Sequence, residues 1–105
     1  MSNKTFIARR LAALGHEARL DIFRLLVKAG RNGLSVGQIA EHEKMAASTL
    51  AHHLKSLVDA GLVLQSKNGR EVVNTAHYDR MTEVLDFLTD QCCVGVAIPS
   101  KQTVE

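Results

Sequence analysis

Several features that define large classes of protein are scarce or absent in this chain. Its 105 residues contain no Trp, one Pro and 4% aromatic residues, so the core must come from Leu, Val, Ile and Ala, which favours packed helices over a β-sandwich. No run of about 18 apolar residues occurs, so no membrane-spanning segment is expected. The two cysteines, Cys92 and Cys93, are adjacent and cannot form the disulfide framework of a secreted domain. Residues 1–4 lead into an amphipathic segment rather than an apolar signal core, so we expect a cytoplasmic protein with free thiols.

Catalytic signatures are also missing from the sequence. It has no Gly-rich phosphate-binding loop, no zinc-hydrolase spacing, and no histidine or carboxylate placed to activate a thiol. We therefore expect no enzyme activity and no required cofactor. The function is to be sought in binding.

The net charge is small but unevenly distributed. Within a total of +2, residues 1–31 carry +5 and residues 44–70 carry +3, whereas residues 32–43 carry −2 and residues 71–105 carry −4. Basic charge concentrated in two stretches suits contact with nucleic-acid phosphates. A solvated surface without special function would also account for it.

Apolar spacing predicts a series of helices in the first half of the chain. Residues 4–14 place apolar side chains at helical period, with Arg9 and Arg10 on the opposite side, and a second helix is expected from about Glu17 to Ala29. A short third helix follows Ser35, which forms a capping-box pattern with the glutamine three residues later.

The segment Ala46–Val63 combines an apolar stripe with a polar outer face. The stripe has the i, i+4, i+7, i+8 spacing of a fourth helix and consists of Leu50, Leu54, Leu57 and Val58. Gly61 supplies the left-handed residue at which a helix ends. Alanine is a poor N-cap, so we expect the start of this helix to be soft until it meets a phosphate. Such a helix, followed at once by a hairpin, is what a major-groove recognition helix with a β-wing requires.

The hairpin is predicted from two strand-like runs on either side of Asn68–Gly69. An Asn-Gly pair between such runs predicts a turn in which both residues have positive φ. This register pairs Leu64 with Val73. It leaves Lys67 and Arg70 beside the tip, where they can rest on a phosphate backbone.

A last amphipathic helix is predicted from about Tyr78 through Cys92. With no further element in the sequence to cover it, this helix and the first present apolar surface that one small domain cannot bury. We therefore predict a two-fold homodimer. The interface residues we expect are Phe6, Ile7, Leu11, Leu85 and Leu88. Residues 1–93 would form one DNA-binding and dimerisation domain, and residues 94–105 a flexible C-terminal tail.

The order of the elements and two motifs resemble the ArsR/SmtB family of winged helix-turn-helix repressors. Residues 11–26, LAALGHEARLDIFRLL, are similar to the family's first signature, with Arg19 and Leu20 in the place of its Arg-Leu pair. Residues 50–63, LAHHLKSLVDAGLV, are similar to its recognition helix. The resemblance covers residues 6–93. It implies a mainly α fold with a small β-hairpin, a homodimer that binds an inverted-repeat operator in double-stranded DNA, and release by an inducer.

The fourth helix and the wing supply the candidate DNA contacts. These are Ser48, Thr49, Ala51, His52, Lys55, Lys67 and Arg70. Ser48 and His52 are best placed for base edges and Lys55 for phosphate, whereas His53 is expected to pack beneath the helix. Adjacent histidines on a helix point about 100° apart, so they cannot chelate one metal. A winged-helix module that binds another protein remains the alternative function.

The cysteine pair is similar to the C-terminal thiol site of some arsenite-responsive members of this family. That likeness implies As(III) or Sb(III) as inducer, bound by Cys92 and Cys93, in line with the preference of soft thiolates for soft ions. On an intact helix the two side chains would diverge by about 100°, so both can bind one ion only if the helix ends near Gln91. Thiol redox sensing remains open, as does a structural role in which Cys92 packs as a small hydrophobe.

The sequence also departs from the family's known sites. Residues 35–38 stand where other members carry Cys-Val-Cys, and they contain no sulfur. His77 and Asp79 are in the wrong order for the last-helix zinc site of another branch, and the third cysteine of the C-terminal thiol branch is absent. The third ligand would have to come from a small-molecule thiol or the partner subunit, or be missing.

Overall fold

The computed structural model describes residues 2–99, which form a mainly helical domain with a small sheet. The helices are α1 (Asn3–Leu14), α2 (Glu17–Ala29), α3 (Val36–Glu43), α4 (Ala47–Asp59) and α5 (Tyr78–Thr89), with a 3-10 turn, η1 (Gly30–Asn32), after α2. The strands are β1 (Leu34–Ser35), β2 (Val63–Asn68) and β3 (Glu71–Ala76). Within residues 2–99, no helix has the length and apolar character needed to cross a bilayer.

The helix boundaries follow local chemistry. Ser35 and Gln38 make both hydrogen bonds of the predicted capping box at the start of α3. Lys44, with φ 53°, ends α3 in the left-handed region and turns the chain toward α4. Beyond α4, Gly61 has φ 80°, which confirms the predicted stop.

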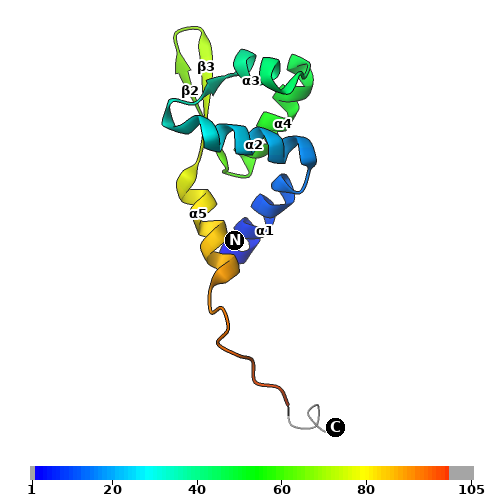
Figure 1. Ribbon diagram of the computed structural model, residues 1–105, viewed down its shortest axis with the longest axis vertical. Coiled ribbons are helices and arrows are strands. Elements are labelled where there is room, and N and C mark those ends of the chain that lie inside the picture. Colours follow the sequence, from blue (N-terminus) through cyan, green and yellow to red (C-terminus); the bar gives the residue numbers. More distant parts are fainter. Residues whose placement is uncertain (1, 100–105) are drawn as a thin grey trace.

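The three strands form an antiparallel sheet in the order β1-β3-β2. β2 and β3 make the predicted hairpin, which projects from the helices in Figure 1. The predicted turn was wrong by one residue and the predicted register by two positions: Asn68 pairs with Glu71, and Leu64 pairs with Thr75 rather than Val73. Gly69, with φ 67°, is therefore the first of the two turn residues, whereas Asn68 stays in the strand without positive φ.

The core lies between α2, α3, α4 and the base of the hairpin. The predicted stripe on α4 faces it, since Leu50, Leu54 and Leu57 are each at most 2% exposed. Further members from the other elements are Ala13, Ile22, Phe23, Leu26, Ile39, Leu62, Val63 and Ala76. This packing fixes one face of α4 and leaves the opposite face to solvent.

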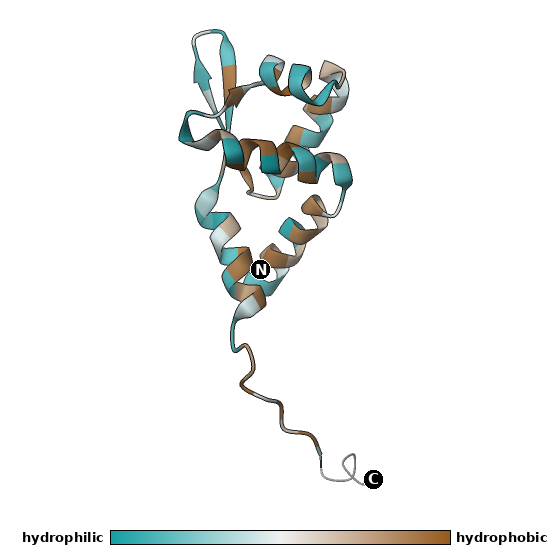
Figure 2. Cartoon of the chain, in the orientation of Figure 1, coloured by the Kyte–Doolittle hydropathy of each residue, from teal (hydrophilic) through white to brown (hydrophobic). Residues whose placement is uncertain are grey.

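α1 and α5 form a second layer, packing against each other on the side of α2 away from the hairpin (Figure 1). Brown apolar segments run along both helices in Figure 2. Residues 94–99 continue beyond α5 without regular secondary structure, and residues 100–105 of the predicted tail lie outside the described residues.

Three expectations for this layer need correction. Ile7 is 2% exposed, so it is buried within its own chain and offers no surface to a second copy. Arg10 does not share the solvent side with Arg9, because its side chain turns inward and is 6% exposed. α5 ends at Thr89 rather than running through Cys92, because the backbone of Asp90 turns to φ −57° and ψ 134°.

Candidate nucleic-acid interface

The outer face of α4 carries the predicted recognition residues side by side. Ser48, Thr49, Ala51, His52 and Lys55 are all exposed, opposite the leucine stripe that holds the helix on the core. Polar side chains of this size on a solvent-facing helix match the donors and acceptors that base edges present in a major groove.

The N-terminus of α4 is open to an anion. Ala46 occupies the N-cap position with φ −63° and ψ 146°, and its methyl side chain cannot accept a hydrogen bond from the first turn. Ser48 and Thr49 lie in that turn, where backbone N–H groups point outward along the helix axis. A helix start with this geometry suits a phosphate of the DNA backbone.

The three candidate phosphate-binding cations differ in whether a neighbouring carboxylate already pairs with them. Lys55 Nζ donates to Asp59 Oδ2 at 3.0 Å along the same helix, so a phosphate must compete with this carboxylate. The pair is exposed and costs little to open. Lys67 and Arg70 are exposed at the end of the hairpin, with Arg70 in the turn itself. The wing thus presents its cations as predicted, despite the altered register.

His53 packs beneath α4, as predicted, and is 7% exposed. Its Nδ1 accepts from Arg19 Nε at 3.2 Å, and its ring lies 4.8 Å from that of His16, which caps α2. Burial lowers the pKa of His53, and the nearby His16, Arg19 and His52 lower it further. His53 is therefore held neutral as an acceptor, joining the recognition helix to the start of α2.

Two buried polar residues, Asn74 and Arg10, were not predicted from the sequence. Asn74, fully buried on β3, accepts from Gln65 Nε2 at 2.8 Å and donates to the Leu34 carbonyl at 3.2 Å, so it fixes all three strands. Arg10 donates to the Ala60 carbonyl and to Glu83. Neither has a local sequence signal, because their partners lie 9 to 73 positions away.

The cysteine pair lies in a turn just after α5. Cys92 and Cys93 are both exposed, and their sulfur atoms are 3.1 Å apart. Gln91 and Cys93 have φ of 60° and 66°, so the backbone has left the helix before either thiol. Two sulfurs that bind one ion through bonds of about 2.3 Å lie roughly 3.2–3.8 Å apart, so this turn brings the pair close to a chelating separation. The hydrogen bond with Cys93 raises the pKa of Cys92.

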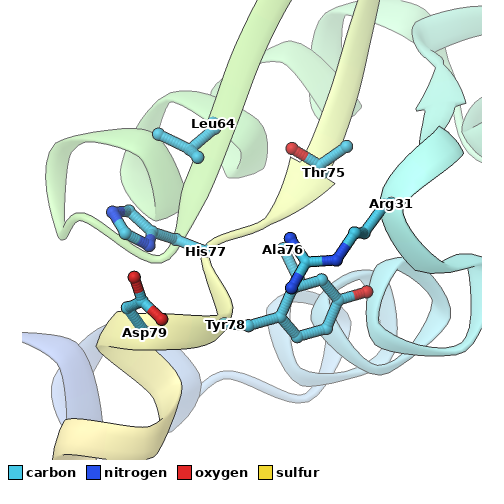
Figure 3. Close-up of a pocket in the computed structure, with 7 residues that line it drawn as sticks. All are labelled: Arg31, Leu64, Thr75, Ala76, His77, Tyr78 and Asp79. Carbon is cyan, nitrogen blue, oxygen red and sulfur yellow. The ribbon is translucent and has the colours of Figure 1, made fainter.

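His77 and Asp79 line a small cavity where β3 passes into α5 (Figure 3). The cavity is about 170 Å³, and Arg31 lies over the Tyr78 ring at 5.6 Å on its far side. Among residues 2–99, no cluster of three or more His, Cys, Asp or Glu side chains is arranged to hold a metal ion. The structure therefore offers His77 and Asp79 no third ligand within that range.

Four of the five predicted dimer residues are available to a partner. The exposed fractions are 41% for Phe6, 38% for Leu11, 55% for Leu85 and 57% for Leu88. Phe87 of α5 is also 41% exposed and was not among the predicted interface residues. Leu85 and Leu88 lie about 60° apart around α5, which packs against α1, so they and the exposed side chains of α1 are the candidate apolar face. Phe87 lies about 160° from Leu85 around the helix, in a hollow lined by Asn3, Glu83, Asp86 and Asp90.

Comparison with known proteins agrees with this architecture. Residues 14–65 match a family model described as a helix-turn-helix domain. The chain is 36% identical over 88 residues to an arsenical resistance operon repressor from Staphylococcus xylosus, an alignment that covers 79% of this chain and 82% of the relative.

Solved structures show the same fold. An ArsR-like transcriptional regulator from Rhodococcus sp. RHA1 aligns with a TM-score of 0.74 and 28% identity, covering 84% of this chain and 80% of that one. A homodimeric winged helix-turn-helix DNA-binding domain from Mycobacterium bovis aligns with a TM-score of 0.66 and 24% identity, covering 87% of this chain and 89% of that one. The α3–α4 pair and the β2–β3 hairpin are thus a helix-turn-helix and its wing.

Proposed function

This chain belongs to the ArsR/SmtB family of winged helix-turn-helix transcriptional regulators, and from this premise we propose that it is a homodimeric repressor released from an inverted-repeat operator by a thiol-binding inducer. The observation that carries DNA binding is the exposed polar face of α4 beside a basic wing. Ser48 and His52 contact base edges, while Lys55, Lys67 and Arg70 contact phosphates.

DNA binding is tested with a duplex selected by the protein from a random library. We expect His52→Ala to reduce the preference for the selected duplex over random DNA about tenfold or more, because a base contact is lost. Arg70→Ala should weaken binding to both and lower the slope of log affinity against log salt by about two per dimer. Lys4, an exposed lysine on α1, supplies the control: Lys4→Ala should leave that slope unchanged. Equal affinity of the parent for selected and random DNA at all salt concentrations would contradict sequence-specific binding.

The inducer proposal rests on the exposed thiol turn. Two sulfurs 3.1 Å apart favour a soft thiophilic ion, and As(III) or Sb(III) is the class that the arsenical resistance relative suggests. In neutral solution As(III) is As(OH)3, and each thiol that binds it gives its proton to a hydroxide that leaves as water. No net proton is released, so apparent affinity for arsenite should change little between pH 6 and pH 8. Oxidation would instead close the pair into a disulfide between neighbouring residues, which is strained because adjacent Cα atoms lie only about 3.8 Å apart, below the roughly 4.4–6.8 Å that disulfides usually span.

The sensing experiment titrates the reduced protein–DNA complex with arsenite, antimonite, zinc, cadmium and peroxide. We expect arsenite or antimonite to release the parent from DNA and to leave the Cys92→Ser/Cys93→Ser variant bound. Release by peroxide, but not by arsenite or antimonite, would mean that the thiols respond to oxidation rather than to an ion. Identical responses from the variant and the parent would exclude the thiols as the sensor.

A further inference from the structure

Arg10 is a buried cation that links three helices. Its side chain projects from α1 and is 8% exposed. Nε donates to the Ala60 carbonyl at 3.2 Å, and one terminal nitrogen donates to Glu83 Oε1 at 3.3 Å. The Phe6 ring lies 5.7 Å from the guanidinium carbon and covers it on α1.

One end of this link is the C-terminus of the recognition helix. Ala60 is the C-cap of α4, where carbonyl groups lack intrahelical partners and carry partial negative charge. The last turn of α4 contains no basic residue of its own, so Arg10 supplies the cation that this end favours. Gly61 adjoins the same contact, since a Cβ there would lie 3.7 Å from the guanidinium.

The other end is the helix that leads to the thiols. Glu83 lies on α5, and its carboxylate also accepts from Arg80 at 2.9 and 3.1 Å. Six residues later α5 ends at Thr89, and the cysteine turn follows. A shift of α5 relative to α4 therefore strains the Arg10 hydrogen bonds, which weaken steeply with distance and angle. Because Arg10 is buried, losing either partner is more costly than at the surface.

We propose that Arg10 is a positioning residue that couples the orientation of α5 to the end of the recognition helix, so that a change at the cysteine turn reaches α4 through Glu83. The inference rests on the proposed function for the identity of the signal. The coupling itself depends only on the contacts of Arg10. It makes Arg10 and Glu83 determinants of the response to inducer, although neither contacts DNA or the inducer.

The test uses Glu83→Gln in the full chain, with Asp86→Asn as the matched control. Glu83 is 44% exposed and glutamine keeps its shape, so the variant should fold; Asp86 is another exposed carboxylate on α5. DNA affinity is measured with and without arsenite, by fluorescence anisotropy on the selected duplex. We expect Glu83→Gln to bind the free duplex within about threefold of the parent and to lose most of the arsenite-induced affinity change, at least about fivefold, while Asp86→Asn behaves like the parent.

A second readout needs no inducer. Amide exchange at residues 60–62 reports on the end of α4, where the Gly61 and Leu62 amides donate to Val58 and Leu57 carbonyls. We expect exchange there to accelerate at least about fivefold in Glu83→Gln and to remain at the parent rate in Asp86→Asn. If arsenite leaves the parent bound to DNA, the proposed inducer is wrong and this exchange alone decides the coupling. If amide exchange at residues 60–62 of Glu83→Gln matches that of the parent, the proposed coupling through Arg10 is wrong.

Discussion

At the scale of single residues, Gly33 is the glycine at which an added side chain would meet its neighbours most closely. Its φ is 66°, and a Cβ there would lie against the Asn74 carbonyl oxygen and 2.7 Å from Thr75 Cγ2. The neighbour is the central strand of the sheet, which cannot give way without breaking the pairing of β1 with β3. Gly33 therefore allows the chain to pass from η1 into β1 against the central strand β3.

We expect Gly33→Ala to lower the free energy of unfolding by roughly 2–4 kcal/mol, from positive φ plus overpacking. Gly69→Ala is the control, because φ is 67° but a Cβ there would meet no atom of the described residues within 4 Å. That variant should lose only about 1 kcal/mol. Urea unfolding measures both, and equal losses would show that the close approach at Gly33 has no energetic weight.

His53 gives the domain a pH-dependent stability. Its pKa is lowered below 6.5 in the fold, chiefly by burial, so the unfolded chain binds more protons than the folded one between the two values. The contribution is complete above about pH 6.5 and is lost as pH falls through the folded pKa. We expect the free energy of unfolding to fall between pH 7.5 and pH 5. His53→Gln, which retains an acceptor for Arg19, should reduce that fall; an unchanged fall would assign it to other groups.

Which residues lie on the surface of α4 could be predicted, because helical period alone separates the leucine stripe from the face of Ser48 and His52. The burial of His53 was predictable for the same reason. The role of Arg10 was not, since a helical arginine is usually solvated and its partners come from α4 and α5. The burial of Asn74 could not be predicted either, because its hydrogen-bond partner Leu34 lies 40 positions away in the sequence.

At the scale of elements, the start of α4 is both a weak point and a contact surface. Ala46→Ser should cap the helix and raise the free energy of unfolding by about 0.5–1 kcal/mol, with DNA affinity retained. Ala46→Asp should stabilise the free protein similarly but weaken DNA binding about tenfold or more, because its carboxylate faces phosphate. Thermal unfolding and anisotropy separate the two effects. Equal DNA affinity for both variants would mean that no phosphate lies at this helix start.

Two element boundaries could not be fixed from sequence for different reasons. The Asn68–Gly69 signal was real, but Gly69 also suits the first position of a turn, and that alternative keeps Asn68 paired in β2. The apolar period of α5 continues to Cys92, yet Thr89 Oγ1 donates back to the Leu85 carbonyl at 2.9 Å and the helix ends there. Ending before the cysteines is what brings both thiols to one side.

At the scale of the whole molecule, the apolar face of α1 and α5 predicts self-association. Leu88→Asp should raise the dimer dissociation constant about 100-fold or more, because two-fold symmetry places the buried carboxylate in the interface twice. Leu64→Asp is the control: Leu64 is similarly exposed, at 51%, but lies on β2. Sedimentation equilibrium measures both. A dimer equally stable in both variants would move the interface away from α5.

Dimerisation through the exposed apolar side chains of α1 and α5 would leave the outer face of α4 free in each copy. Two recognition helices related by a two-fold axis suit half-sites about one helical turn apart. The dimer therefore joins the thiol turn, the Arg10 contacts and the DNA-binding face in one assembly. DNA affinity in this account depends on both copies binding together.

The most direct test of that claim compares duplexes that carry one or two copies of the selected half-site, arranged as an inverted repeat. We predict two chains per inverted repeat, with affinity at least about 100-fold tighter than for a single half-site, since the second contact becomes intramolecular. One chain per duplex, with equal affinity for one and two half-sites, would contradict it.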